Sequence, residues 1–223
     1  MNSKQSILKN VVGFLIVGLV VQTPLALGGQ APVTYIGDPT NYTVGSQTVQ
    51  VYPGALVTLP SGEVRQVLFS GKGTRQKFVA VAKVNVYAIL HYLDEPSALN
   101  SQDPIGSLSG TQTRMLMLQM MQNLSASDMR SGFEDALDVN DIDINATEIR
   151  SLLKQIDFSV NVGDKIFLIG YKSQADAFEN LYVYTEKKTI FEKSPSLVTD
   201  FWKIWFGVPV DKEMAVCKKE LLK

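Results

Sequence analysis

The chain has 223 residues, a length that suits one domain with room for a targeting segment. Apolar residues make up 45% and charged residues 19%, a balance that predicts a packed core and excludes global disorder. The formal net charge is -1 and neither half carries a basic run, so the composition offers nothing to attract nucleic acid or an anionic membrane surface.

Cysteine and histidine are almost absent: Cys217 and His91 are the only ones in the sequence. An intramolecular disulfide is therefore impossible, and a zinc site rich in cysteine and histidine cannot be built. A Ser-His-Asp site would have to use His91, which we expect at the surface, at the end of a strand. Metal sites made of carboxylates alone stay open in principle, but we predict neither a metal nor a cofactor.

The first residues have the pattern of a targeting segment. Lys4 and Lys9 precede an apolar run over 11–21, and small residues follow at 26–29. This order is typical of a secretory signal peptide, to which we assign residues 1–29. The apolar run is short for a membrane span, so we expect no stable span after cleavage and a periplasmic or secreted protein. An uncleaved N-terminal anchor is the alternative.

Residues 30–63 form a predicted N-terminal strand and turn extension. They are rich in Thr, Val, Tyr, Gly and Pro, and Pro53-Gly54 marks a turn after a short strand over 47–52. The segment suits an edge hairpin or an extension specific to this protein.

Two long strands are predicted over 64–93, with Gly71-Lys72-Gly73 interrupting the first. Alternation in the second strand places Tyr87 on the face opposite to Val84 and Val86. Residues 94–110 are predicted to form a loop. Residues 114–121 suit a strand or a helix; we expect their methionines to pack in a core, and an adaptable lipid pocket is the alternative.

The rest of the chain predicts runs of helix and strand. Trp202 and Trp205 lie on the last helix, where we expect one to anchor it and the other to be half exposed. Because helices and strands come in runs, the fold class is α+β, with an antiparallel sheet and helices against one face. The predicted elements are helices over 125–137 and 147–156, a strand over 165–171, a hairpin over 181–192 and a helix over 196–206.

Five short motifs follow one another along the chain: Gly71–Lys77, Val86-Tyr87 with Tyr92-Leu93, Asn123–Phe133, Val162–Lys165 and Phe201–Gly207. In this order they resemble the chalcone-isomerase-like family, in its exported bacterial branch. The resemblance covers residues 64 to 222, so we define 64–223 as a chalcone-isomerase-like domain. It implies an open-faced β-sandwich: a large antiparallel sheet with helices layered on one face and a ligand cleft between them.

The resemblance also implies a ligand site. Family enzymes cyclise chalcones without a cofactor, and related members bind fatty acids. It places Arg75 in the cleft, where a planar guanidinium gives two parallel charge-assisted hydrogen bonds to an anionic oxygen. Tyr87 would add its hydroxyl. The alternatives are a surface arginine that ends a β-turn and a core tyrosine.

Part of the enzymes' polar pattern is missing. By ungapped alignment, Ala82 replaces a threonine, and Met129 and Ala136 replace a tyrosine and an asparagine, so the electrostatic stabilisation of a cyclisation is reduced. We therefore predict an exported, non-catalytic binder of a small amphipathic anion such as a fatty acid. An isomerase (intramolecular lyase) is the first alternative, and an envelope interaction module without a ligand is the second. The oligomeric state stays open.

Overall fold

A computed structural model describes residues 31–173 and 178–223. The signal-peptide prediction for residues 1–29 lies outside these ranges. Eight strands form one antiparallel sheet whose order keeps chain neighbours side by side from β4 onward. The strands, in sheet order, are β1 (Val33–Ile36), β4 (Gly54–Thr58), β5 (Val64–Val79), β6 (Ala82–Leu93), β7 (Thr113–Met120), β8 (Lys165–Lys172), β9 (Glu179–Tyr184) and β10 (Thr189–Ser194).

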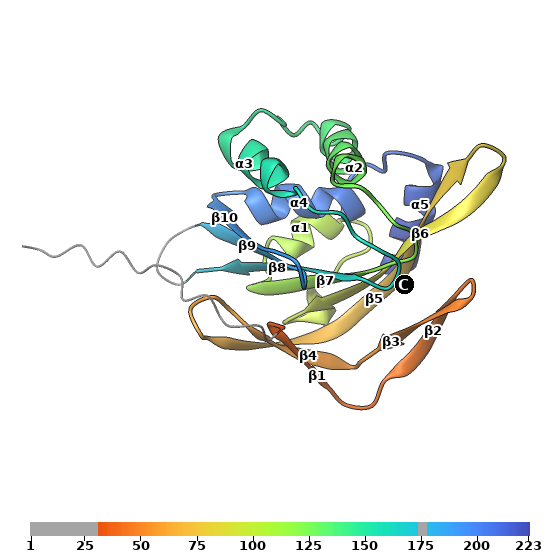
Figure 1. Ribbon diagram of the computed structural model, residues 1–223. Coiled ribbons are helices and arrows are strands. Elements are labelled where there is room, and N and C mark those ends of the chain that lie inside the picture. The colour runs from red at the N-terminus through yellow and green to blue at the C-terminus, as the bar shows by residue number, and fades with distance from the viewer. Residues whose placement is uncertain (1–30, 174–177) are drawn as a thin grey trace, which may run out of the picture.

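The helices cover one face of this sheet, as Figure 1 shows. Ser125 and Asp128 form a reciprocal capping box that begins α2 where the sequence predicts a helix. The predicted α+β class with helices on one face is confirmed. None of the helices between residues 31 and 223 that the structure describes combines the length and apolarity of a membrane span. The helices are η1 (Pro96–Ala98), α1 (Pro104–Leu108), α2 (Ala126–Asp138), α3 (Thr147–Gln155), α4 (Leu197–Phe206) and α5 (Lys212–Leu221).

The N-terminal strands cover part of the other face. β2 (Thr40–Val44) and β3 (Gln47–Val51) form a separate hairpin. With β1 and β4, which form one edge of the curled sheet, this hairpin lies beneath the remaining strands (Figure 1). Val49, Val57 and Tyr92 belong to the apolar core enclosed there. Met115 and Met117 point into this core, whereas Met120 points into the core beneath the helices, because side chains along a strand alternate between faces.

Two local predictions for the middle of the chain are wrong. β5 runs without interruption through Gly71 and Gly73, because these glycines serve the close approach of α5 instead of a turn. A Cβ atom at Gly71 would lie 2.1 Å from the carbonyl oxygen of Leu221, and one at Gly73 would lie 2.9 Å from that of Cys217. The predicted loop over 94–110 contains η1 and α1.

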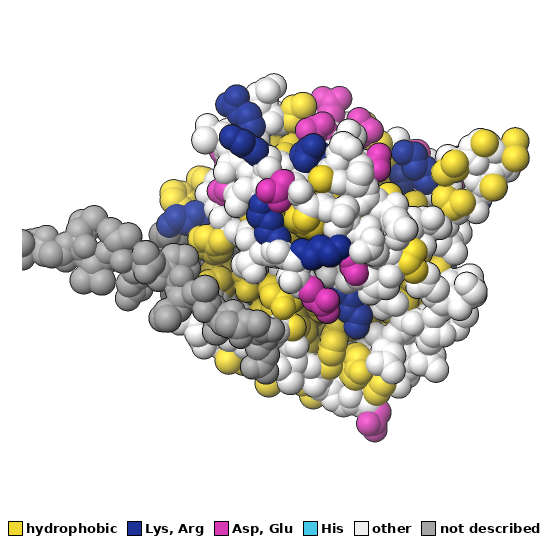
Figure 2. All heavy atoms as spheres, viewed as in Figure 1, with side chains coloured by type: hydrophobic (Ala, Val, Ile, Leu, Met, Phe, Trp, Pro, Cys, Tyr) yellow, Lys and Arg dark blue, Asp and Glu magenta, His cyan; other side chains and the backbone are white. Residues whose placement is uncertain are grey.

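The far ends of β5 and β6 extend beyond the body of the molecule as a hairpin (Figure 1). Val79 pairs with Ala82, so Ala80 and Val81 form a two-residue turn. Hydrophobic side chains gather at the end of this hairpin (Figure 2).

Candidate functional site

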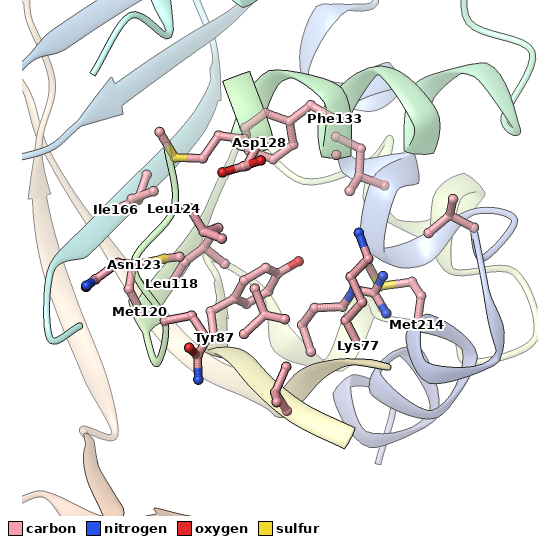
Figure 3. A pocket seen from close by; sticks show the side chains of 18 of the residues that line it. Lys77, Tyr87, Leu118, Met120, Asn123, Leu124, Asp128, Phe133, Ile166 and Met214 are labelled. Atoms are coloured by element: carbon pink, nitrogen blue, oxygen red, sulfur yellow. The ribbon is translucent and has the colours of Figure 1, made fainter. Parts of the chain in front are cut away.

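A cavity of about 450 Å³ lies between the sheet and the helices, at the end where β5 and β6 begin to leave the body. β5, β6 and β7 supply its floor, and α2, α4 and α5 supply its walls (Figure 3). Most of the lining is apolar, a composition typical of small-molecule sites. Representative apolar side chains are Val84, Leu118, Met129, Phe133, Ile204 and Met214.

Arg75 lines this cavity and is only 9% exposed. Its Nη1 and Nη2 atoms each donate to one carboxylate oxygen of Asp211, both at 2.7 Å, and Nη1 also donates to the carbonyl oxygen of Gln76 at 2.6 Å. Burial alone would lower the pKa of Arg75, but the hydrogen bonds to Asp211 raise it, and the net direction is upward. The guanidinium is therefore charged and held in one orientation.

Asp211 is the functional neighbour that sequence reasoning missed. It is the N-cap of α5 and accepts a hydrogen bond from the backbone N–H of Met214 at 2.8 Å. Burial would raise its pKa, but the hydrogen bonds from Arg75 and from the Met214 backbone, together with the charge of Arg75, outweigh burial and hold the pKa below the ordinary value. An aspartate two residues after Pro209, with Glu213 in the following turn, is a helix-start signal that could have located α5.

Tyr87 lines the same cavity, and Figure 3 shows its hydroxyl pointing toward the open space. The hydroxyl oxygen accepts a hydrogen bond from Nε1 of Trp205 at 3.0 Å. Burial raises the pKa of Tyr87, so the phenol is protonated at neutral pH. Among the described residues its proton has no acceptor, which leaves it free to bind a ligand oxygen.

The predicted orientation of Tyr87 relative to its neighbours is wrong, since Val84 and Val86 line the same cavity. The cause is a β-bulge. Tyr87 pairs with Arg75 and Asn85 pairs with Gln76, so Val86 is an extra residue between two paired positions. Such an insertion shifts the alternation of side chains by one and directs an additional residue to the same face.

Further polar groups lie at the mouth. Lys77 and Asp128 both border the opening and point toward it in Figure 3. The hydrogen bond from the Ser125 hydroxyl lowers the pKa of Asp128, which keeps this carboxylate charged. Gln122 and Asn123 complete the polar rim. The mouth thus carries both signs of charge, whereas the interior offers Arg75 and Tyr87.

The three residues that interrupt the enzymes' pattern do not share one location. Met129 lines the cavity, but Ala136 is buried in the core beneath the helices and Ala82 follows the turn of the projecting hairpin. The polar content of the site therefore has to be judged from the groups that line it.

The expectations for His91 and the two tryptophans are corrected. His91 is fully buried, with Nδ1 at 2.8 Å from the Ser70 hydroxyl and Nε2 accepting from Trp202 Nε1 at 3.2 Å. Burial, together with the charge of Arg114, lowers the pKa of His91 to about 3. It is neutral and is not among the residues that line the cavity. Trp202 and Trp205 are both buried, so neither is half exposed.

Within residues 31–173 and 178–223, no three His, Cys, Asp or Glu side chains lie close enough to hold a metal ion. The site's chemistry is thus that of one buried cation, one phenol and an apolar wall.

The curled eight-stranded antiparallel sheet, with its helix layer, defines a chalcone-isomerase-like fold, which confirms the predicted resemblance at the level of the fold. A solved structure with this arrangement is the Arabidopsis thaliana fatty-acid binding protein AtFAP1, at a TM-score of 0.53 and 16% identity. The match covers 75% of this chain and 95% of that chain. No protein-family model matches the sequence, and no curated protein matches it.

Proposed function

We propose that this protein is an exported, non-catalytic binder of a small amphipathic anion such as a fatty acid. The observation that carries the proposal is the apolar cavity of about 450 Å³ with Arg75 and Tyr87 in its wall. That volume lies in the lower part of the range of about 300–1,000 Å³ typical of ligand pockets. The fold shared with a plant fatty-acid binding protein supports the same class of ligand.

The head group would bind at Arg75. Three of the five guanidinium N–H bonds are used by Asp211 and Gln76, which leaves two donors for a ligand carboxylate. The Tyr87 hydroxyl supplies another donor, and the Lys77 ammonium supplies positive charge at the mouth. Asp211 opposes an incoming anion, so the site requires the ligand to contribute apolar contacts as well as charge.

The ligand chain would lie against the apolar wall. Each methylene group that leaves water contributes about 0.8 kcal/mol, so a medium-length acyl chain supplies the larger part of the affinity. Flexible side chains such as Met129 and Met214 can adapt to chains of different shape. Because the apolar wall binds the chain and Arg75 binds the head group, the cavity favours an amphipathic anion over a small polar anion.

We favour ligand binding over catalysis because neither polar group in the cavity interior readily gains or loses a proton near neutral pH. The pKa values of Arg75 and Tyr87 are both raised, so each keeps one protonation state around neutral pH. General acid–base catalysis needs a group whose pKa lies near the working pH. Histidine is the residue whose ordinary pKa lies in that range, but His91 is not part of the cavity lining.

Native mass spectrometry of the purified protein, followed by thermal unfolding with added fatty acids, tests the proposal. We expect a co-purified acyl ligand or a rise in unfolding temperature that Arg75→Gln reduces. A protein that carries no lipid and gains no stability from any chain length contradicts it. Turnover of chalcones that depends on Arg75 would instead establish the isomerase alternative.

A position of Arg75 in bulk solvent would favour the envelope-module alternative, and the burial of Arg75 in a cavity wall argues against it. Export is the other part of the proposal and depends on residues 1–29. Intact-mass measurement of protein recovered from a periplasmic fraction tests it. We expect a new N-terminus between Ala26 and Ala31, and a full-length protein held in the membrane would instead indicate an uncleaved anchor.

A further inference from the structure

The turn at the end of the β5–β6 hairpin is unusually apolar for an exposed position. Val81 is 97% exposed, and Phe78 and Val79 are 48% and 55% exposed. Figure 2 shows hydrophobic side chains gathered at the end of the projecting hairpin. Isolated exposed apolar residues are common, but a contiguous group on a projecting turn indicates an interaction surface.

The backbone of this turn supports the same interpretation. Ala80 has a φ of +55°, a backbone conformation that residues other than Gly, Asn and Asp rarely adopt. Two-residue hairpin turns usually place Gly or Asn at such positions. Turn formation alone therefore does not account for Ala80-Val81. Backbone strain of this kind persists at functional sites, and here it accompanies a fully exposed apolar side chain.

Lysines surround the base of the apolar turn. The ammonium groups of Lys83 and Lys212 lie 5.5 and 5.0 Å from the centre of the Phe78 ring. Lys77 lies one residue before Phe78 on β5. Glu213 partly offsets this charge, at 3.7 Å from Lys83. Lys83 and Lys212 are far apart in the sequence and come together only at the Phe78 ring, so the lack of a basic run in the sequence did not exclude this group.

The same hairpin forms part of the cavity mouth. Lys77, Val79 and Val84 line the cavity, while Ala80 and Val81 lie beyond it. A partner that bound the turn would therefore lie next to the opening through which an acyl ligand would enter.

We propose that the β5–β6 hairpin docks this protein on an anionic lipid bilayer. The turn over 78–81 inserts among the acyl chains, and Lys77, Lys83 and Lys212 contact the phosphate layer. Apolar insertion combined with basic residues at the headgroup level is the arrangement that membrane-surface proteins use. In its consequence for ligand transfer this inference rests on the proposed function, because docking brings the cavity mouth to the source of the ligand.

Co-sedimentation of the purified protein with vesicles tests the proposal. We expect binding to vesicles of phosphatidylglycerol and phosphatidylethanolamine, weaker binding to pure phosphatidylcholine, and loss of most binding in about 1 M salt, where the Debye length is about 3 Å. Val81→Asp should weaken the partition coefficient by about tenfold or more, since it places a charge at the depth of insertion. Val208→Asp is the matched control, because Val208 is 57% exposed and is not part of the hairpin.

A second variant separates docking from a structural role. Ala80→Gly combined with Val81→Asn installs favourable turn residues, so it should raise the unfolding temperature while it lowers vesicle binding. A wild-type protein that ignores anionic vesicles, or a Val81→Asp variant that binds like wild type, overturns the proposal. So does a concentration-dependent dimer that Val81→Asp dissolves, which would make a second copy the partner.

Failure of the docking proposal can be distinguished from failure of the proposed ligand binding. Fatty-acid binding is measured in vesicle-free buffer, where Val81→Asp should leave the affinity within about twofold because the residue lies outside the cavity. Vesicle binding without any soluble ligand would support docking and contradict the proposed function. Soluble ligand binding without vesicle binding would do the reverse.

Discussion

Two arginine–carboxylate pairs lie under the same helix layer, and they differ in what surrounds them. Arg114 and Glu179 meet at 2.9 Å with side chains only 3% and 6% exposed. Arg75 and Asp211 meet at 2.7 Å, but their side chains are 11% and 37% exposed and the arginine borders a cavity. The same chemistry thus makes a closed structural pair in one place and an accessible cation in the other.

The closed pair is enclosed by protein hydrogen bonds. Arg114 also donates to the Leu108 carbonyl at 3.0 Å and to the Thr199 hydroxyl at 3.1 Å. Glu179 accepts from the Thr199 backbone N–H at 2.6 Å. These contacts join β7, β9, α1 and α4, so the pair fixes the helix layer on the sheet. The open pair joins β5 to α5, and two of the five guanidinium N–H donors of Arg75 have no partner among the described residues.

Breaking the closed pair should give the largest effect. Arg114→Leu leaves the buried Glu179 charge without its partner, and we expect a loss of about 3–5 kcal/mol in the free energy of unfolding, measured by urea denaturation. Arg75→Gln should cost far less stability, because Asp211 can be hydrated. If both variants lose the same stability, the distinction between the two pairs is wrong.

The open pair should instead dominate ligand affinity. Arg75→Gln removes charge-assisted hydrogen bonds worth about 1.5–3 kcal/mol, so the Kd for a fatty acid should rise by about tenfold to a hundredfold in isothermal titration calorimetry. Thr199→Val serves as the control, because it weakens the closed network without touching the cavity lining. An unchanged Kd in Arg75→Gln would remove Arg75 from the ligand site.

The closed region should also respond to pH, through His91. Burial holds the folded-state pKa near 3, whereas the unfolded chain takes up a proton below about 6.5. The stability that this group contributes is therefore complete above about pH 6.5 and is lost as the pH falls toward 3. Urea denaturation should show a loss of about 2 kcal/mol between pH 7 and pH 5.

His91→Gln is the matched variant, because an amide preserves a hydrogen-bond acceptor for Trp202 but does not titrate. Its unfolding free energy should change little over the same interval, which lies above the lowered pKa values of Asp128 and Asp211. A slope that is identical in the two proteins would assign the pH dependence to another group.

The sequence predicted more of the fold than of the site. Most elements from β5 to α4 follow from periodicity, caps and turns, as the capping box at Ser125 illustrates. The bulge at Val86 was not predictable, because register is a property of two paired strands. The burial of His91 was missed for a related reason, since Trp202 and Ser70 reach it from distant parts of the chain.

Asp211 shows why the missing part matters. Arg75 was singled out from a local motif, but its partner lies 136 positions away and begins a helix whose polar sequence gave no strong apolar stripe. A motif can therefore indicate a cation without revealing that a carboxylate already contacts it. The availability of Arg75 to a ligand is a property of the tertiary structure.

The smallest expected effect is a gain in ligand affinity, and it tests whether Asp211 limits the availability of Arg75. Asp211→Asn keeps a good N-cap for α5 but removes the negative charge that competes for Arg75. The Kd for a fatty acid should fall by severalfold, equivalent to about 1 kcal/mol, since an incoming carboxylate no longer meets a like charge. Titration calorimetry of wild type and variant in the same buffer measures the difference.

The direction of that change discriminates between roles for the open pair. If Asp211 served mainly to hold Arg75 in position, the weaker hydrogen bonds of an amide would reduce affinity. If it competes with the ligand, as an anion site requires, affinity rises for fatty acids and stays constant for their uncharged methyl esters. A rise with both ligands would trace the gain to a change in cavity shape, and a fall with fatty acids alone would show that the Arg75–Asp211 pair itself organises the site.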